Sequence, residues 1–179
     1  MRRRLFKTII LFIAASAVLS YSFRDAVRAG TDPYYVRVIK AYDGDTVSLF
    51  INGRREKARL IGIDTPELGQ RPWGLKAKKH LEELLSNSAW TVAVEFDVER
   101  RDKYGRLLCY LRTSGGKIIN LQMVKDGYAM LLTIPPNVKH VDELRKAQHE
   151  ARQQGLGIWG RKGLKERPSD YRKKHPYRQ

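Results

Sequence analysis

The alternation of apolar and polar residues predicts three short strands early in the chain. Residues 35–40 and 46–51 are rich in β-branched and aromatic side chains, and they flank an Asp-Gly-Asp turn at 43–45. Asn-Gly at 52–53 predicts a tight hairpin, because both residue types tolerate positive φ. A third strand is expected over 57–63. Three short strands joined by tight turns form a meander.

The rest of the chain mixes helical and strand periodicity. Leu75, Leu81, Leu84 and Leu85 supply an apolar face for one helix. The expected elements are a helix over 74–85, strands over 90–96 and 106–112, a short helix over 120–125 capped by Asn120, and a helix over 138–154 that ends at Gly155. Five short strands with a helix between the third and the fourth have the connectivity of a small OB-type barrel.

The predicted fold class is therefore α+β and mainly β: a five-stranded OB-fold barrel with about three helices, preceded by an apolar signal or anchor helix. Residues 34–161 form the expected domain, and residues 162–179 form a basic tail. Sandwiches and other small barrels produce similar patterns, so the pattern alone leaves those folds open.

Residues 1–30 have the form of an export signal. A basic start precedes an uncharged run at 8–23, and Ala15-Ser16-Ala17 is a candidate cleavage site. The uncharged run is shorter than the roughly 20 residues that span a bilayer, but Lys7 can snorkel, so a retained membrane anchor stays open. Both alternatives place the domain outside the cytoplasm, secreted, periplasmic or tethered to the membrane.

Charge indicates the class of partner, and cysteine content bears on disulfides. The formal net charge is +16, and residues 161–179 carry eight basic and two acidic residues. Such a tail attracts polyanions such as nucleic acid or anionic lipid, or simply keeps the protein soluble. The single cysteine, Cys109, excludes an internal disulfide and lies in an apolar run, where a buried small hydrophobe is expected.

Carboxylates at the ends of the predicted strands are candidates for a divalent-cation site. Asp43 and Asp45 bracket a glycine in a turn, and Asp64 and Glu67 follow the third strand. Calcium and magnesium prefer oxygen ligands, and no Cys/His cluster suggests zinc. Taken singly, each motif has a simpler explanation as a turn or a helix cap, and Asp43 is expected to be a turn residue.

Two arginines supply the complementary charge. Arg59 lies in the third strand, and Arg106 begins a later strand directly after Asp-Lys-Tyr-Gly. A guanidinium group is a planar fork that matches two phosphate oxygens at once. Each arginine alone is also explained as a surface residue of its strand, so the combination with the carboxylates carries the hypothesis.

Three motifs together resemble the staphylococcal nuclease (thermonuclease) family. They are Asp-Gly-Asp-Thr-Val at 43–47, Ala-Arg-Leu-Ile-Gly-Ile-Asp-Thr-Pro-Glu at 58–67 and Asp-Lys-Tyr-Gly-Arg at 102–106. The resemblance covers residues 35–160, including the closing Gly-Leu-Gly-Ile-Trp at 155–159. It implies an OB barrel with three helices.

The resemblance also implies roles for single residues. Asp45, Asp64 and the backbone carbonyl of Thr65 are expected to bind calcium, and Glu67 is expected to act as general base or to orient the attacking water. Arg59 and Arg106 are expected to hold the scissile phosphate. Lys103 and Tyr104 are expected to touch the neighbouring phosphate.

The implied activity is a calcium-dependent nuclease that cuts DNA, RNA or both and leaves 3′-phosphate ends, as a monomer without an organic cofactor. The alternative is a noncatalytic OB-fold protein that binds single-stranded nucleic acid. One departure from the family concerns residues 130–136, which lack the tyrosine-rich stretch that stacks on a base. Trp73 is a candidate replacement for that stretch, although a helix-start or core position explains it better.

Overall fold

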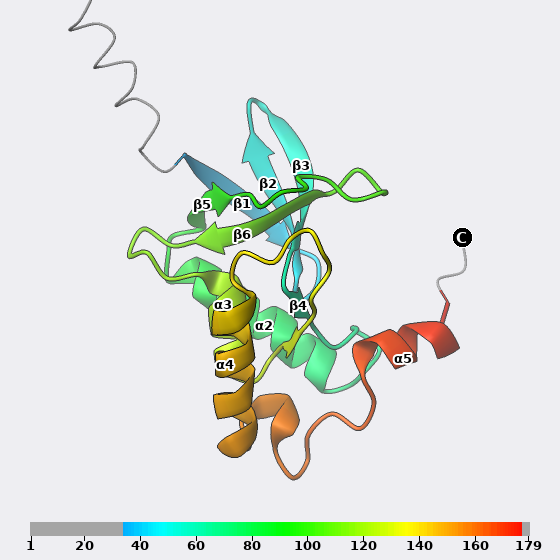
Figure 1. Ribbon diagram of the computed structural model, residues 1–179. Coiled ribbons are helices and arrows are strands. Elements are labelled where there is room, and N and C mark those ends of the chain that lie inside the picture. The colour runs from blue at the N-terminus through cyan, green and yellow to red at the C-terminus, as the bar shows by residue number, and fades with distance from the viewer. Residues whose placement is uncertain (1–33, 177–179) are drawn as a thin grey trace, which may run out of the picture. The chain divides into compact units, whose positions relative to one another are not determined.

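Five strands close into a barrel in the order β1-β2-β3-β6-β5 in a computed structural model that describes residues 34–176 (Figure 1). The barrel strands are β1 Tyr35–Ala41, β2 Thr46–Ile51, β3 Arg54–Leu60, β5 Thr91–Glu95 and β6 Leu107–Arg112. A second, two-stranded sheet pairs β4 Ile63–Asp64 with β7 Met130–Leu131. The predicted five-stranded barrel in a mixed α+β chain is confirmed.

The register of the barrel brings distant residues together. Strands β1, β2 and β3 pair antiparallel, and Thr46 in β2 lies opposite Arg59 in β3. Strand β3 also pairs parallel with β6, where Arg59 lies opposite Leu108, and this pairing helps to close the sheet. Barrel closure removes open edges from strands too short to form a stable sheet alone. It also places Arg59 beside the turn that precedes Thr46.

Three helices cover one end of the barrel in Figure 1: α2 Trp73–Ser86, α3 Ile119–Lys125 and α4 Val141–Gln153. A 3₁₀ turn, η1 Gly157–Trp159, follows them. The expected basic tail contains a further helix, α5 Pro168–Lys174. Pro168 and the acidic Asp170 lie in the first turn of α5, and its last turn is basic. Proline suits the first turn of a helix, and this order of charges complements the helix dipole, so the sequence favours a helix here.

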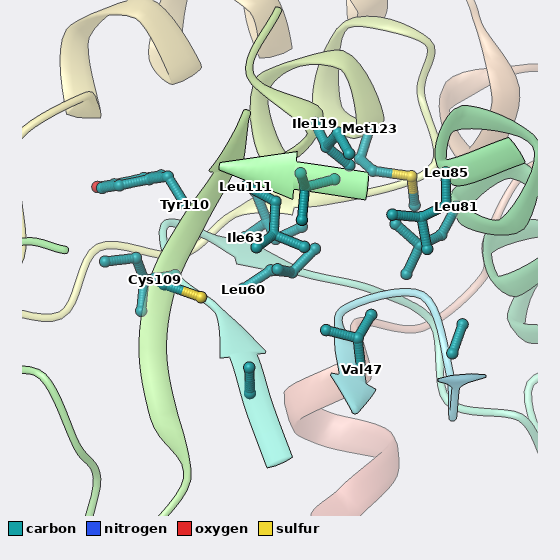
Figure 2. Packing of buried hydrophobic residues seen from close by; sticks show 14 of the residues in the cluster. Val47, Leu60, Ile63, Leu81, Leu85, Cys109, Tyr110, Leu111, Ile119 and Met123 are labelled. Carbon is teal, nitrogen blue, oxygen red and sulfur yellow. The ribbon is translucent and has the colours of Figure 1, made fainter. Parts of the chain in front are cut away.

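The barrel interior forms the hydrophobic core. Figure 2 shows side chains from β2, β3, β6, α2 and α3 gathered in it. Helix α2 buries Ala77, Leu81 and Leu85, whose i, i+4 spacing defines its inner face. Leu75 is 45% exposed, so its predicted place on that face is wrong. Cys109 is fully buried, as expected for a small hydrophobe.

Two local predictions need correction. The predicted strand over 57–63 is interrupted, because Gly62 adopts φ +81° and a Cβ there would lie 2.5 Å from Leu144 Cδ1. Asn120 does not cap α3, whose N-cap is Ile118. The Asn120 side chain instead accepts from the Leu111 amide at 3.1 Å and donates to the carbonyls of Ile61 and Cys109. This buried amide joins the chain after β3 to β6.

The expected export segment at 1–30 lies outside the described residues. Within residues 34–176, no helix combines the length and the apolar character needed to cross a bilayer.

Candidate active site

The Asp-Gly-Asp turn between β1 and β2 holds Asp45 in a buried position. Asp43 Oδ1 accepts a hydrogen bond from the Asp45 amide at 3.0 Å, which makes Asp43 the turn residue that the sequence predicts. Burial raises the pKa of Asp43, while Arg59 opposes that rise. A Cβ on Gly44 would lie 2.8 Å from Thr65 Cβ and 2.9 Å from Ala77 Cβ. Only glycine therefore lets the turn approach these two residues so closely.

Asp45 is fixed by hydroxyl and amide donors. Its Oδ2 accepts from the Thr65 amide at 2.9 Å and from Thr65 Oγ1 at 2.7 Å. Its Oδ1 accepts from Thr46 Oγ1 at 3.2 Å. Asp45 and Thr65 are both buried, so these bonds satisfy a carboxylate with little access to water. The turn and the segment after β4 are thereby locked together.

Arg59 bridges the two aspartates that the sequence assigns to one site. Its Nη1 forms an ion pair with Asp45 Oδ1, and its Nη2 lies 3.4 Å from Asp64 Oδ1 and donates to the Ile63 carbonyl at 3.2 Å. The structure thus brings Arg59, Asp45 and Asp64 together.

Burial lowers the pKa of Arg59. The negative charges of Asp64 and Asp43 raise this pKa, and the positive charges of Arg106 and Arg172 lower it further. The two other guanidinium groups therefore share the electrostatic surroundings of Arg59. Guanidinium stays protonated in proteins, so the group is a permanent positive charge. Positive charge from β3, from the turn before β6 and from α5 therefore acts on one place.

Arg172 of helix α5 is a member of the site that sequence reasoning missed. Its Nη1 and Nη2 donate to Asp64 Oδ1 and Oδ2, both at 3.0 Å, and Nη1 also donates to Glu67 Oε1 at 2.6 Å. The hydrogen bonds to Asp64, followed by those to Glu67, raise the pKa of Arg172. The helix signals around Pro168 and Asp170 would have predicted α5, but nothing in the sequence indicates where that helix docks.

Glu67 is positioned through its backbone. Its amide donates to Gln70 Oε1 at 2.9 Å, and its carbonyl accepts from the Gln70 amide at 2.8 Å. A Cβ on Gly74, in the first turn of α2, would lie 2.0 Å from the Glu67 carbonyl oxygen. The start of α2 therefore packs directly against the main chain of Glu67. Trp73 is the first residue of that helix, as its helix-start interpretation predicts.

The Asp-Lys-Tyr-Gly-Arg motif at 102–106 forms a separate turn. Asp102 accepts from Arg106 Nε at 2.7 Å and from the amides of Tyr104 and Arg106. Tyr104 is 73% exposed, with Lys103 Nζ 5.1 Å and Arg106 Cζ 5.6 Å from its ring centroid. The ion pair of Arg106 with Asp102 uses its Nε nitrogen. Lys103 and Tyr104 lie on the surface, accessible to a polymer.

Asp45 and Asp64 supply oxygen donors of the kind that hard divalent cations prefer. Among residues 34–176, no three His, Cys, Asp or Glu side chains are grouped closely enough to hold a metal ion. Asp45 and Asp64, however, contact the same Arg59 guanidinium, and Arg172 also neutralises Asp64. Carboxylate oxygens suit calcium or magnesium when carbonyl and water oxygens complete the coordination. A cation at Asp64 would have to take oxygens that Arg172 now holds.

Comparison with known proteins gives a consistent result. The family described as "Staphylococcal nuclease homologue" matches residues 57–161. The chain is 37% identical over 129 residues to a thermonuclease of Staphylococcus intermedius, covering 69% of this chain and 75% of the relative. It is 30% identical over 163 residues to a thermonuclease of Staphylococcus hyicus, covering 84% and 95%.

A third relative is longer than the matched region. The chain is 36% identical over 135 residues to Endonuclease YncB of Bacillus subtilis, covering 72% of this chain and 63% of the relative. The chain thus spans less than two thirds of the length of this relative.

Proposed function

This chain belongs to the staphylococcal nuclease family, and from that premise we propose that it is a calcium-dependent nuclease that hydrolyses phosphodiester bonds of DNA, RNA or both. The observation that carries the proposal is the contact of Arg59 with both Asp45 and Asp64. Carboxylates and a buried guanidinium in one place supply groups for a cation and for a phosphate. Relatives named as nucleases support the same class of substrate.

Asp45, Asp64 and the Thr65 carbonyl are the proposed cation ligands. Asp45 and Asp64 are nearly buried, so few water molecules compete for their oxygens. Thr65 keeps Asp45 in place with two hydrogen bonds. Bound there, a divalent cation would polarise a phosphoryl oxygen and make a bound water more acidic.

Arg59 and Arg106 are the proposed ligands of the scissile phosphate. Negative charge grows on its nonbridging oxygens as water attacks, and preorganised guanidinium groups bind that charge more strongly in the transition state. The Arg59 guanidinium, which contacts Asp45 and Asp64, would donate hydrogen bonds to a phosphate oxygen of the bound substrate. Loss of one such contact typically costs about 3–4 kcal/mol of barrier.

Glu67 is the proposed general base, or the group that orients the water. The water oxygen forms a bond to phosphorus, its proton passes to the Glu67 carboxylate, and the bond to the 5′ oxygen breaks. The departing 5′ oxygen takes up a proton, and the phosphate stays on the 3′ carbon. Lys103 and Tyr104 are the proposed contacts of the adjoining phosphate, and the exposure of Tyr104 supports this role.

Export and domain boundaries are part of the same proposal. We expect residues 1–30 to act as a signal peptide or membrane anchor, residues 34–161 to form the nuclease domain as a monomer, and residues 162–179 to be a basic C-terminal tail. Helix α5 of this tail packs against the domain. N-terminal sequencing of the mature protein separates the two forms of export. A retained Met1 in the membrane fraction indicates an anchor, and a start near Val18 indicates cleavage.

A plasmid-digestion assay tests the catalytic proposal. Wild type should cut in calcium and not in chelator, and Glu67→Gln should lose at least about a hundredfold in rate. Glu99→Gln, which changes an exposed carboxylate that has no role in the proposal, should cut like wild type. Absence of cleavage by wild type in calcium would overturn the proposal.

The noncatalytic alternative makes the opposite prediction in the same experiment. A single-strand-binding OB protein would retain labelled oligonucleotide in a gel shift and leave plasmid and oligonucleotide intact in calcium. Binding without cleavage by the wild-type protein is therefore the outcome that favours the alternative.

A further inference from the structure

The segment after η1 is docked against the loop that carries Glu67. In Figure 1, α5 lies beside the chain that enters α2. Trp73 Nε1 donates to the Lys162 carbonyl at 3.3 Å, and Gln70 Nε2 donates to the Glu166 carbonyl at 2.9 Å. Tyr171 packs so closely on Gly69 that a Cβ at Gly69 would lie 2.2 Å from the Tyr171 hydroxyl. These contacts hold α5 in a defined position beside the site.

The Arg172 side chain extends from α5 to the carboxylates of Asp64 and Glu67. It donates to both oxygens of Asp64 and to Glu67 Oε1. Its side chain is 35% exposed, whereas that of Asp64 is 7% exposed. Arg172 therefore lies on the solvent side of Asp64 and covers the oxygens that a ligand from solution would approach.

The same carboxylates carry the proposed chemistry. Asp64 is a proposed cation ligand, and Glu67 is the proposed base. A guanidinium bound to both oxygens of Asp64 uses its favoured lone-pair directions and adds positive charge where a divalent cation would bind. A second cation at the same carboxylate is opposed by like-charge repulsion. Arg172 and the divalent cation thus require the same oxygens and the same negative charge.

We propose that Arg172, held by α5, is an internal competitor of the divalent cation. Arg172 occupies the site until α5 withdraws, and the cation binds once α5 has withdrawn. This inference rests on the proposed function, because it takes Asp64 as a ligand of the cation. The apparent affinity for the cation is then the intrinsic affinity reduced by the fraction of molecules with α5 withdrawn. Cation binding and α5 docking oppose each other by the same factor.

Calcium titration of the full chain by calorimetry, without nucleic acid, tests the competition. Arg172→Gln should bind calcium about tenfold more tightly than wild type, because the competing charge is gone. Lys173→Gln is the matched control: it removes one positive charge from the next position, where the side chain pairs only with Asp170 among the described residues. It should bind calcium like wild type. Equal or weaker binding by Arg172→Gln would overturn the competition.

A second variant tests the docking without changing charge. Gly69→Ala adds a methyl group where the Tyr171 hydroxyl lies, so α5 should leave its position and calcium binding should again tighten. Gly115→Ala is its control, because a Cβ there would lie 3.9 Å from its nearest neighbour, the Thr113 hydroxyl oxygen. Unchanged affinity in Gly69→Ala, with α5 shown to be released by faster proteolysis after residue 161, would contradict the proposal.

The titration also separates the two hypotheses. If wild type and both variants bind no calcium, the metal part of the proposed function fails, and the competition fails with it. If wild type binds calcium and cuts nucleic acid while Arg172→Gln has the same calcium affinity, the proposed function stands and only the competition fails. A Michaelis constant for nucleic acid that rises in Arg172→Gln at unchanged calcium affinity would make Arg172 a substrate ligand instead.

Discussion

Thr65 donates two hydrogen bonds to a single oxygen of Asp45, from its amide at 2.9 Å and from Oγ1 at 2.7 Å. The two residues are twenty positions apart, and both are buried. The contact joins the turn before β2 to the segment after β4. Because Asp64 directly precedes Thr65, it also fixes the distance between the two aspartates of the site.

Thr65→Val should weaken both the fold and the site. Valine has a similar volume but lacks the hydroxyl, so the buried Asp45 carboxylate loses one donor and keeps the amide. Removing a hydrogen bond to a charged group costs about 1.5–3 kcal/mol. Urea unfolding measures this loss, and calcium titration should show weaker binding.

Thr133→Val is the control for this substitution, because Thr133 is exposed in the chain between β7 and α4. Its free energy of unfolding should stay within about 0.5 kcal/mol of wild type. A Thr65→Val protein as stable as the Thr133→Val protein would show that the hydroxyl bond contributes nothing to Asp45.

Gly74→Ala should displace Glu67. Alanine ordinarily stabilises a helix relative to glycine by about 1 kcal/mol. At Gly74, however, the methyl group would meet the Glu67 carbonyl oxygen at 2.0 Å, so the backbone must move. We expect a drop in turnover and a loss of stability of about 1–3 kcal/mol. Gly115→Ala, in an open turn, should change neither quantity. Full activity of Gly74→Ala would show that the Glu67 backbone is not constrained there.

The sequence predicts the barrel well because its signals are local. Alternating strands and tight turns such as Asn52-Gly53 specify the meander without reference to distant residues. The break at Gly62 is different, because it depends on Leu144 of α4 packing into the space beside the glycine. Asn120 likewise looks like a helix cap locally, but it is used to satisfy backbone groups of β6 and of the chain after β3.

The candidate site likewise has a part that local sequence predicts and a part that depends on tertiary packing. Asp45, Asp64 and Arg59 lie within a short stretch of the meander, and strand pairing brings them together as predicted. Arg172 contacts Asp64, which lies 108 positions earlier in the chain. It belongs to a basic segment, and the sequence alone does not distinguish it from arginines that simply face solvent. Only the docking of α5 selects Arg172, and docking is a tertiary property that no local pattern contains.

Cys109 should resist thiol reagents while the protein is folded. It is fully buried, and burial raises the pKa of its thiol to about 12. The reactive thiolate is therefore scarce at pH 8, and the sulfur is inaccessible as well. Iodoacetamide followed by mass spectrometry should label the protein in 6 M urea and not in buffer. Rapid labelling of the native protein would show that the barrel opens around β6.

A cluster of charges at the end of β5 sets the response of stability to acid. Glu95 Oε2 lies 2.5 Å from Arg112 Nη2, and its Oε1 lies 2.7 Å from Lys139 Nζ and 2.9 Å from His140 Nε2. Burial disfavours the charged form of Glu95. The hydrogen bonds from Lys139, Arg112 and His140 outweigh burial and lower its pKa to about 2.

Glu95→Gln should therefore destabilise the protein at neutral pH and matter little in acid. A folded-state pKa of about 2, below the ordinary 4.5, means that ionised Glu95 stabilises the fold above about pH 4.5, and this contribution fades as the pH falls toward 2. The expected loss at pH 7 is about 1–3 kcal/mol, measured by urea unfolding from pH 7 to pH 2.5. The exposed Glu99→Gln control should track wild type throughout. A Glu95→Gln deficit independent of pH would mean that Glu95 acts through packing and not through its charge.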